Sequence, residues 1–375
     1  MRARVARPLG SLQADFGSEG ILAKTDGDAA ATLVHGGREL ARVFVDGYGE
    51  DVRSKDGYFG DLASNSAFKQ LVKDLRLELK ETGGDPIEDE PAELTRRRID
   101  KLLKEGDAPS AGVILSIVEQ FAENVAKVVK SLIKLKSWGD VERIVVGGGF
   151  RDSRVGELVI GRAAILVRDF GSAVEIAPIR HHPDEAGILG AAQLFPLKTI
   201  KDCQHLIGVD IGGSNFRCGL VALNRDADKD LRKAEVVGHQ LWRHADEKAS
   251  LDHCMERLGA MLRESVKYGE KRGLPISPLI GVGVPGTVLA DGRLEGGVLN
   301  LPGDWKSPDF NLPARLRTMI PEIEGEPTQV LMHNDAVVQG LSEAPFMTDV
   351  AAWAVLTIGT GLGNAVFRNK EAKRK

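Results

Sequence analysis

The stretch LIGVDIGGSN at positions 206–215 decides the fold that we expect for this chain. A run of apolar residues ends at Asp210, a pair of glycines follows, and FRCGLVAL at 216–223 indicates a second strand. A glycine turn between two strands lets backbone N–H groups approach a phosphate, because no Cβ stands in the way. The stretch therefore predicts a β-hairpin whose turn binds phosphate through Gly212, Gly213, Ser214 and Asn215.

Two further segments carry glycine turns. VLTIGTGLGNAVF at 355–367 has the same order of strand, turn and strand, and RIVVGGGF at 143–150 places three glycines after a short strand. One glycine hairpin is more often only a tight turn, but three such segments in one chain favour nucleotide binding. Gly359, Thr360 and Gly361 suit the phosphates of ATP, and Asp210 is placed to hold Mg²⁺ directly or through water, because hard cations prefer oxygen ligands.

Three more motifs follow the first hairpin in order: IGVGVPGTV (280–288), GVLNLPGDW (297–305) and HNDAVVQGLSE (333–343). Together with the glycine turns, they resemble the ROK family of repressors, uncharacterised reading frames and sugar kinases, within the actin/hexokinase superfamily. The resemblance implies an α/β fold of two actin-like (ribonuclease H-like) domains, each with a mixed sheet, and a cleft between the domains. It also implies ATP and Mg²⁺ as cofactors, with the adenosine packed on Gly147 and Gly148.

The order of these motifs is unusual, because the adenosine-binding turn normally comes last in that superfamily and here precedes the first hairpin. The resemblance therefore implies a circularly permuted chain. We expect an N-terminal arm over 1–20, a larger lobe over 21–197 that 345–375 completes, and a smaller lobe over 198–344. Residues 33–41 and 366–373 both resemble the outgoing strand of the second phosphate hairpin, as a tandem duplication would leave them.

Asp335 is the candidate general base and also a substrate-binding residue. A kinase must remove the proton of a sugar hydroxyl during attack on the γ-phosphoryl group, and a carboxylate between a strand and a helix suits that work. Asn300 and Asn334 offer the paired donor and acceptor groups that bind sugar hydroxyls. The alternative for Asn334 and Asp335 is a helix cap. Trp305 follows a Pro-Gly turn, which favours core packing over a place in the sugar site.

Many ROK proteins carry a zinc site, and SKDGYFGDLAS at 54–64 resembles its remnant. The three cysteines become Ser54, Asp56 and Asp61, and the sugar-contacting glutamate becomes Ala63. Hydroxyl and carboxylate ligands do not suit a closed structural zinc site, so we expect none. In GYGED at 47–51 the resemblance keeps Glu50 as a substrate-binding residue and loses a histidine. The alternative is a turn-rich loop with scattered acidic residues.

The overall composition excludes several classes of protein. The chain has 375 residues, 28% of them charged, and a net charge of −4, which gives no general reason to bind nucleic acid or a membrane surface. No apolar run approaches the roughly 18 residues of a membrane span, and no signal-peptide pattern follows the basic first residues. Three scattered cysteines are too few for a disulfide framework. We expect a cytoplasmic protein that binds a small-molecule sugar, and the resemblance also implies a homodimer.

The hydrophobic periodicity indicates strands that alternate with helices in a mixed-sheet α/β fold. We expect helices over 68–81, 93–105, 111–136, 155–167, 183–194, 251–271 and 335–343. We expect strands over 144–146, 174–178, 235–242, 279–284 and 329–332, besides the hairpins over 206–223 and 351–367.

These observations predict ATP-dependent phosphorylation of a hexose or N-acyl hexosamine. One alternative is a catalytically impaired pseudokinase that binds sugar or nucleotide and has a regulatory role, because Ala63 and the lost histidine remove substrate contacts. A transcriptional repressor would need an N-terminal helix-turn-helix, and residues 1–35 show no two-helix pattern. The sequence leaves the identity of the sugar open, and it also leaves open polyphosphate as the phosphate donor.

Overall fold

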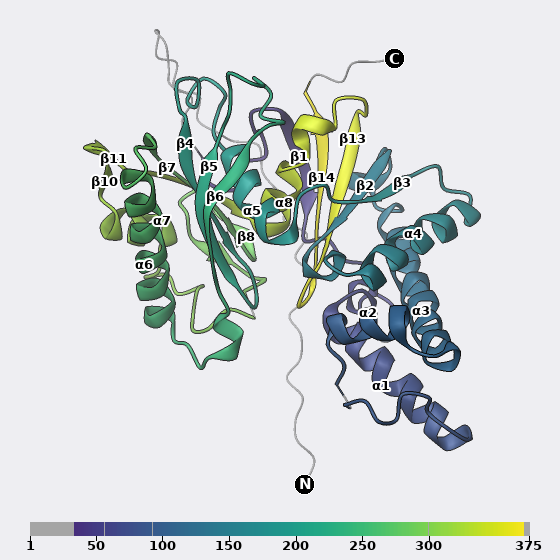
Figure 1. Cartoon of the computed structure of the whole chain (residues 1–375). Coiled ribbons are helices and arrows are strands. Elements are labelled where there is room, and N and C mark those ends of the chain that lie inside the picture. The colour runs from purple at the N-terminus through teal and green to yellow at the C-terminus, as the bar shows by residue number, and fades with distance from the viewer. Residues whose placement is uncertain (1–33, 56, 92, 299, 371–375) are drawn as a thin grey trace. The chain divides into compact units, whose positions relative to one another are not determined.

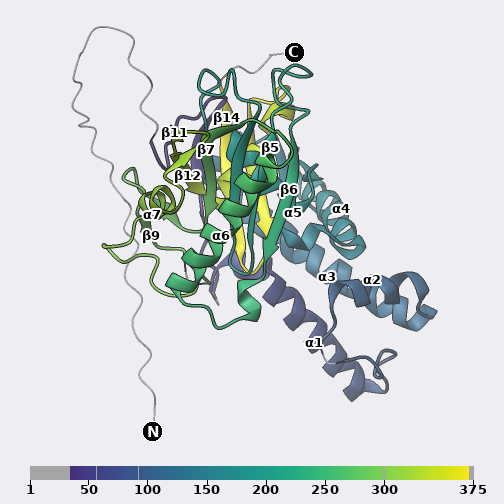
Figure 2. The same cartoon turned by 60° about the vertical axis from the view of Figure 1, so that its left-hand side comes forward.

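The computed structural model of the chain describes residues 34–370 except 56, 92 and 299. Two five-stranded sheets form its framework, with helices packed on both (Figures 1 and 2). The predicted arm at 1–20 lies outside the described residues. Within the described part of the chain, no helix has both the length and the apolar character that crossing a membrane would require.

The first sheet begins with the predicted hairpin. β4 (His205–Ile211), β5 (Phe216–Ala222) and β6 (Glu235–Trp242) form an antiparallel meander, whereas β7 (Ile276–Val284) and β12 (Gln329–Asn334) run parallel to β4. The strand order is β12-β7-β4-β5-β6. The carboxyl ends of β4, β7 and β12 therefore meet at one edge, where parallel strands commonly present their ligand-binding residues.

The second sheet repeats this pattern with strands from distant parts of the chain. β13 (Ala352–Ile358), β14 (Leu362–Asn369) and β1 (Val43–Tyr48) are antiparallel neighbours, and β2 (Arg143–Gly147) and β3 (Glu175–Pro178) run parallel to β13. The order is β1-β14-β13-β2-β3, so the yellow C-terminal hairpin lies beside the strands of residues 43–178 (Figure 1). The predicted α/β class with two mixed sheets is confirmed.

Four helices accompany the second sheet. They begin at side-chain caps formed by Ser64, Thr95, Asp107 and Ser153, which satisfy otherwise unpaired N–H groups. Apolar residues at helical spacing bury one face of the predicted long helix, where Phe68, Phe121 and Phe150 pack ring against ring. The helices are α1 (Asn65–Thr82), α2 (Arg96–Glu105), α3 (Ala108–Leu132) and α4 (Arg154–Asp169).

The first sheet has a separate apolar core with α6 (Leu251–Glu270) and α7 (Leu312–Met319). Trp305 is fully buried there against Phe216 and Phe310, which confirms core packing for this tryptophan. The hydrophobic periodicity did not predict α7. The remaining short strands pair as two ribbons, β8 (Thr287–Val288) with β9 (Leu294–Glu295) and β10 (Glu322–Ile323) with β11 (Glu326–Pro327).

Two helices connect the sheets, α5 (Pro183–Ala192) and α8 (Asp335–Leu341). A Cβ on Gly190 of α5 would collide with the carbonyl oxygen of Val338 in α8, so the two helix backbones approach closely. On the other side of α8, Gly340 lies against Phe367 of β14. We expected α5 in the larger lobe, yet Ile188 of α5 contacts Gly208 of β4 in the predicted smaller lobe. The described residues form one contact unit.

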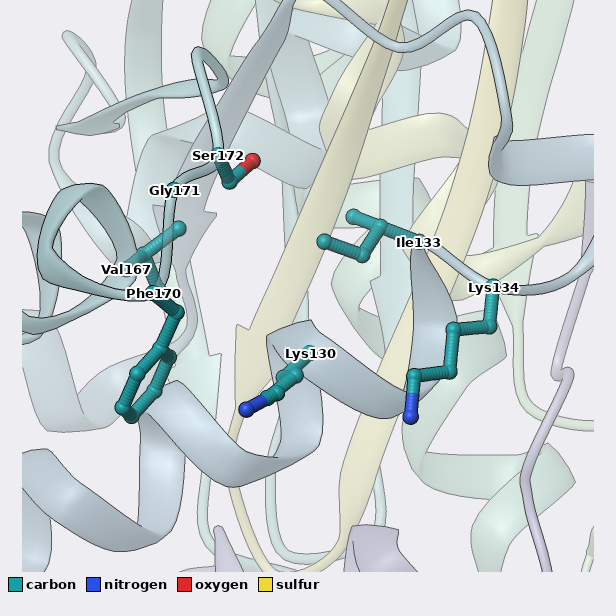
Figure 3. Close-up of a pocket in the computed structure, with 7 residues that line it drawn as sticks. All are labelled: Lys130, Ile133, Lys134, Val167, Phe170, Gly171 and Ser172. Carbon is teal, nitrogen blue, oxygen red and sulfur yellow. The ribbon is translucent and has the colours of Figure 1, made fainter.

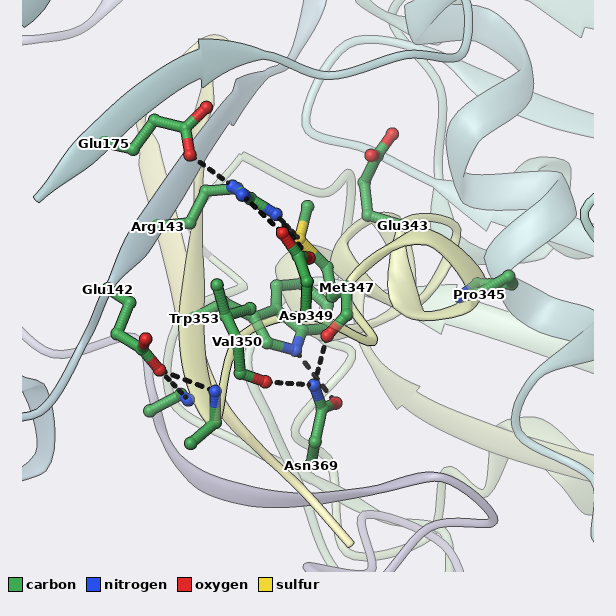
Figure 4. A network of polar contacts seen from close by, with 12 residues as sticks. Glu142, Arg143, Glu175, Glu343, Pro345, Met347, Asp349, Val350, Trp353 and Asn369 are labelled. Carbon is green, nitrogen blue, oxygen red and sulfur yellow. Dashed lines mark hydrogen bonds and ion pairs between the residues drawn. The ribbon is translucent and has the colours of Figure 1, made fainter. Parts of the chain in front are cut away.

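A polar network ties the C-terminal hairpin to strands β2 and β3 (Figure 4). Arg143 contacts Glu175 Oε2 at 2.7 Å and both carboxylate oxygens of Asp349 at 2.9 and 3.0 Å. Asn369 donates to the carbonyl oxygens of Met347 and Val350. These contacts hold the central strand β13 between its neighbours, so they stabilise a sheet that distant segments must complete.

The described part of the predicted repeat at 33–41 has a different position from 366–369. Gly36 N–H donates to Met332 O at 3.0 Å and His35 Nδ1 accepts from Met332 N at 3.3 Å, so residues 35–37 lie along β12 of the first sheet. Residues 366–369 belong to β14 of the second sheet. The prediction that both segments are the same outgoing strand was therefore wrong. A short glycine turn is compatible with many structural environments, so tertiary contacts determine where residues 35–37 lie.

Candidate functional site

The first and second glycine turns touch each other. Ser214 Oγ and Thr360 Oγ1 are 2.7 Å apart in a hydrogen bond between the two sheets. Each turn is closed by its own backbone bond, from Gly212 N–H to Asn215 O and from Gly359 N–H to Gly361 O, both 2.9 Å. The structure therefore brings the two predicted phosphate turns together at the edge where β4 and β13 end.

Asn300 lies against the first turn, as the predicted site requires. A Cβ on Gly213 would be 2.9 Å from Asn300 Cβ and 3.5 Å from its Nδ2, so only glycine lets the exposed amide approach this closely. The buried His244 supports the turn from behind, because its Nε2 donates to Gly212 O at 2.9 Å. His244 was not among the predicted site residues.

The third glycine turn lies beside the second. Gly148 has φ = +79° and its Cα lies so close to the backbone of Ile358 that a Cβ there would be only 2.5 Å from Ile358 O. Gly147, at the end of β2, packs on Ile179. Since Gly359 directly follows Ile358, the predicted adenosine-binding and phosphate-binding turns are neighbours at the carboxyl ends of β2 and β13.

Asp210 forms an ionic network that the sequence motifs did not predict. Arg217 Nη1 lies 3.1 Å from Asp210 Oδ2, and Arg217 Nε lies 2.7 Å from Asp184 Oδ1 at the start of α5. Asp210 is 1% exposed, and burial raises the pKa of its carboxyl, with Asp184 acting in the same direction and Arg217 opposing. A signal existed, because in a hairpin with a turn at 212–215 positions 210 and 217 face each other.

Asp335 lies near this network at the start of α8. Burial raises the pKa of its carboxyl to about 7, and the negative charge of Asp210 adds to the increase. Backbone N–H groups and the Asn334 amide act in the opposite direction. A carboxyl group that titrates near neutral pH can accept a proton with little loss of driving force, which is the property of a general base.

Asn334 is the N-cap of α8. Its Oδ1 accepts from Ala336 N at 3.0 Å and Val337 N at 3.3 Å, and its Nδ2 donates to Gly286 O at 3.1 Å. The alternative interpretation of Asn334, a helix cap, is therefore present. The bond to Gly286 also joins the VPG turn to the end of β12, so Asn334 fixes the backbone next to Asp335.

Glu50 is hydrogen-bonded to residues on and next to the second sheet. Its carboxylate accepts from Ser137 Oγ at 2.7 and 2.8 Å and from Trp138 Nε1 at 2.8 Å. Its backbone pairs with the Asn364 side chain of β14. The structure thus gives Glu50 a set of protein partners that do not include Asp335, Asn300 or Asn334.

The acidic residues of the loop that resembles the zinc remnant support turns. Asp61 Oδ2 accepts from Tyr58 N at 3.0 Å, and Asp51 Oδ1 accepts from Gly60 N at 3.0 Å. Asp56 lies outside the described residues. Ala63 is buried in the core of the second sheet. These contacts agree with a turn-rich loop held by its own acidic side chains.

Asp210 fits the requirements of a magnesium ligand. Its Oδ1 is buried and, among the described residues, has no hydrogen-bond partner. Carboxylate oxygens are the ligands that Mg²⁺ prefers, and Arg217 occupies only Oδ2. Asp210 could therefore hold the cation directly or through water, next to the turn at 212–215.

One hollow in the described part of the chain lies away from this site (Figure 3). It has a volume of about 360 Å³ between the ends of α3 and α4, where Lys130 lies over the ring of Phe170. None of its lining residues belongs to the predicted site. The lining consists of Lys130, Ile133, Lys134, Val167, Phe170, Gly171 and Ser172.

The fold and the site together define an α/β protein in which three glycine turns meet near three carboxylates. Part of the chain is similar to a ROK family glucokinase from Streptomyces griseus in complex with glucose and AMPPNP, at 20% identity over 46% of each chain and a TM-score of 0.32. Part is similar to a ROK hexokinase from Thermus thermophilus, at 21% identity over 43% of this chain and 46% of that one, with a TM-score of 0.28. The matches span less than half the length of these solved chains. No family model and no curated protein matches the chain.

Proposed function

We propose that this chain transfers the γ-phosphoryl group of ATP to a hydroxyl of a hexose or N-acyl hexosamine, with Asp335 as the general base. The observation that carries the proposal is the contact between the two phosphate turns through Ser214 and Thr360, at the edge that holds Asp210 and Asp335. Phosphoryl transfer depends mainly on positioning of the phosphates and on electrostatic stabilisation of their charge. The backbone N–H groups of the two turns at this edge would serve both purposes.

Asp335 performs the proton transfer in this proposal. Its carboxylate accepts the proton of the sugar hydroxyl while the sugar oxygen forms a bond to the γ-phosphorus and the bond to the bridging oxygen of ADP breaks. Asn300, exposed beside Gly213, would bind a sugar hydroxyl. Asn334 would act through its cap of α8, which fixes the backbone of Asp335, and through the remaining N–H of its amide.

The three turns would share the nucleotide. The turns at 212–215 and 359–361 would bind phosphate oxygens, and Gly147 and Gly148 would pack on the adenosine. Mg²⁺ held by Asp210 would neutralise charge on the phosphates. Glu50, assigned to the sugar by resemblance, would act indirectly if its bonds to Ser137 and Trp138 persist, because they fix the loop that follows β1.

The proposal is tested by ADP release from Mg·ATP across a panel of hexoses and N-acyl hexosamines, with polyphosphate as a second donor. The wild-type chain is compared with Asp335→Asn and with Asp309→Asn, which changes an exposed carboxylate outside the site. Sugar-dependent turnover that disappears only in Asp335→Asn supports the proposal and identifies the sugar. Turnover that survives in Asp335→Asn would remove Asp335 from the mechanism.

A pseudokinase is the second candidate, and one observation favours it. Two of the predicted sugar-binding residues are engaged internally, Glu50 by Ser137 and Trp138 and Asn334 by the start of α8. Tight binding of ATP or sugar without turnover by any member of the panel would support this candidate. Absence of both nucleotide binding and sugar binding would contradict both candidates.

We also infer that the order of the motifs reflects a circular permutation. Both sheets contain three antiparallel strands and two further strands that run parallel to the first of the three. In the first sheet the three antiparallel strands, β4 to β6, come first in the chain. In the second sheet β13 and β14 begin only at residue 352, whereas the third antiparallel strand, β1, begins at residue 43. A chain joined from 370 to 34 and opened between β3 and β4 would place the two patterns in tandem. Folding of such a rejoined chain, with the same nucleotide affinity, is the expected result.

A further inference from the structure

Arg96, the first residue of α2, contacts both the third glycine turn and the start of α1, which in turn contacts the second glycine turn. Its Nη1 donates to Gly149 O, in the turn that follows β2, and lies 3.5 Å from Asn65 Oδ1. Asn65 is the first residue of α1, and its N–H donates to Gly359 O at 2.9 Å in the second phosphate turn. The guanidinium therefore lies at the carboxyl ends of β2 and β13, where open α/β sheets commonly bind ligands.

Within the described part of the chain, no carboxylate pairs with the charge of Arg96. The side chain is half-buried, yet among the described residues no carboxylate oxygen lies within 4.0 Å of it. Asp100 and Asp152 are near enough to act on its charge, but Asp100 accepts from Arg154 N and Val155 N, and Asp152 contacts His182. A partly buried guanidinium is normally paired, because desolvation of an unpaired cation is costly.

The free donors of Arg96 suit an anion. Both of its described hydrogen bonds use Nη1, so within the described residues Nε and Nη2 remain for another acceptor. Gly149 brings its backbone under the guanidinium, since a Cβ there would be 3.6 Å from Nη2. Arginine presents N–H groups in a planar fork that matches phosphate oxygens.

We propose that Arg96 binds the phosphate chain of a nucleoside di- or triphosphate whose adenosine lies on the third glycine turn. This inference rests on the proposed function and adds a residue from the segment 65–105, where no nucleotide-binding motif was predicted. Arg96 serves as a fixed positive charge between the adenosine-binding turn and the second phosphate turn. It is a binding residue that distinguishes a nucleotide from a nucleoside.

Equilibrium binding of ADP and of adenosine to the full chain tests this assignment. The variants are Arg96→Met, which removes the charge, Arg96→Lys, which keeps the charge without the fork, and Arg97→Met, an exposed neighbour on the same helix turn. We expect Arg96→Met to weaken ADP binding by about ten- to a hundredfold, as loss of a charge-assisted hydrogen bond does, and to leave adenosine binding unchanged. Arg96→Lys should keep part of the affinity, and Arg97→Met all of it.

Each other outcome is informative. Unchanged ADP affinity in Arg96→Met overturns the assignment and leaves the proposed function intact. Equal losses for ADP and adenosine also overturn it, since Arg96 would then only support the turn at Gly149. If the wild-type chain binds neither ligand, the proposed function falls and the assignment falls with it.

Discussion

Ser214 and Thr360 are 146 positions apart in the chain, and their hydroxyl oxygens are 2.7 Å apart in space. Each belongs to a glycine turn that closes on itself, and each turn belongs to a different sheet. This bond is the point where the two halves of the proposed phosphate site meet. Phosphates bound by both turns would have to separate the two hydroxyls, so the contact should respond to nucleotide.

Cysteines at these positions should report that separation. The double variant Ser214→Cys/Thr360→Cys should form a disulfide readily, because a bond of about 2.05 Å between sulfurs needs only a small approach of the turns. We expect Mg·ATP to slow formation of this disulfide, measured by titration of free thiols in a Cys203→Ser background. Ser214→Cys alone is the control. An unchanged rate with bound ATP would mean that phosphates do not enter between the turns.

The rate of phosphoryl transfer should depend on pH through Asp335. With a carboxyl pKa of about 7, the base form of Asp335 is minor in acid and dominant in alkali, so kcat should rise with pH and level off above about pH 8. Asp335→Asn should lower kcat by roughly 10²- to 10⁴-fold and abolish this rise. A midpoint near the ordinary value of an aspartate would contradict the assignment.

Asp335 should also lower the free energy of unfolding at pH values where its carboxyl group is ionised. The folded state keeps the proton up to about pH 7, whereas the unfolded state loses it near 3.8, so the free energy of unfolding falls as pH rises between these values. Asp335→Asn should therefore be more stable than the wild type at alkaline pH by about 1 to 3 kcal/mol, allowing for partial exposure, and equally stable in strong acid. Urea unfolding at several pH values measures this difference, with Asp309→Asn as control.

His333 should give the opposite dependence. It is buried, its Nδ1 accepts from Asn334 N and its Nε2 donates to Gly37 O, and burial lowers its pKa to about 4. Between pH 6.5 and 4 the unfolded state binds a proton that the folded state does not, so stability should be lost as pH falls through this window. The loss should reach up to about 3 kcal/mol and be absent in His333→Gln.

Exposed His239 provides the control for that measurement. His239→Gln should keep the acid-sensitive window of the wild type. If His333→Gln keeps it as well, another group is responsible for the loss of stability.

Two glycines in helices should respond in opposite ways to alanine. A Cβ at Gly190 of α5 would collide with Val338 O in α8, whereas at Gly161 of α4 no atom lies within 4 Å. Gly190→Ala should destabilise the protein by about 2 kcal/mol or more, because the two helices must move apart. Gly161→Ala should stabilise it by about 0.5 to 1 kcal/mol. Thermal unfolding of both variants checks the contact between α5 and α8, and equal midpoints would contradict it.

The sequence predicted those elements whose signals are local. The strand at 235–242 coincides with β6, and the predicted long helix at 111–136 overlaps α3 at Ala108–Leu132. The missed helix α7 has only eight residues, although Asn311 as its cap and Pro313 in its first turn were available signals. The match between 33–41 and 366–373 was wrong because a short glycine turn does not specify its partner strand.

The proposed site could be predicted where it depends on single turns and not where it depends on contacts between elements. The glycine turns and Asp335 follow from motifs. Arg217 could have been found by counting the register of the hairpin, since it faces Asp210. Asp184 and Arg96 could not be predicted from the sequence, because tertiary packing of α5 and α2 brings them to the proposed site.

The composition of the second sheet has a consequence for synthesis on the ribosome. β3 ends at Pro178, but β13, which lies between β2 and β14, begins only at Ala352. At typical translation speeds the middle strand emerges on the order of ten to thirty seconds after β3, and the first sheet is complete by then. During this interval the apolar edge of β2 has no partner strand. A nascent chain should therefore depend on a chaperone most between the synthesis of β3 and that of the hairpin β13–β14.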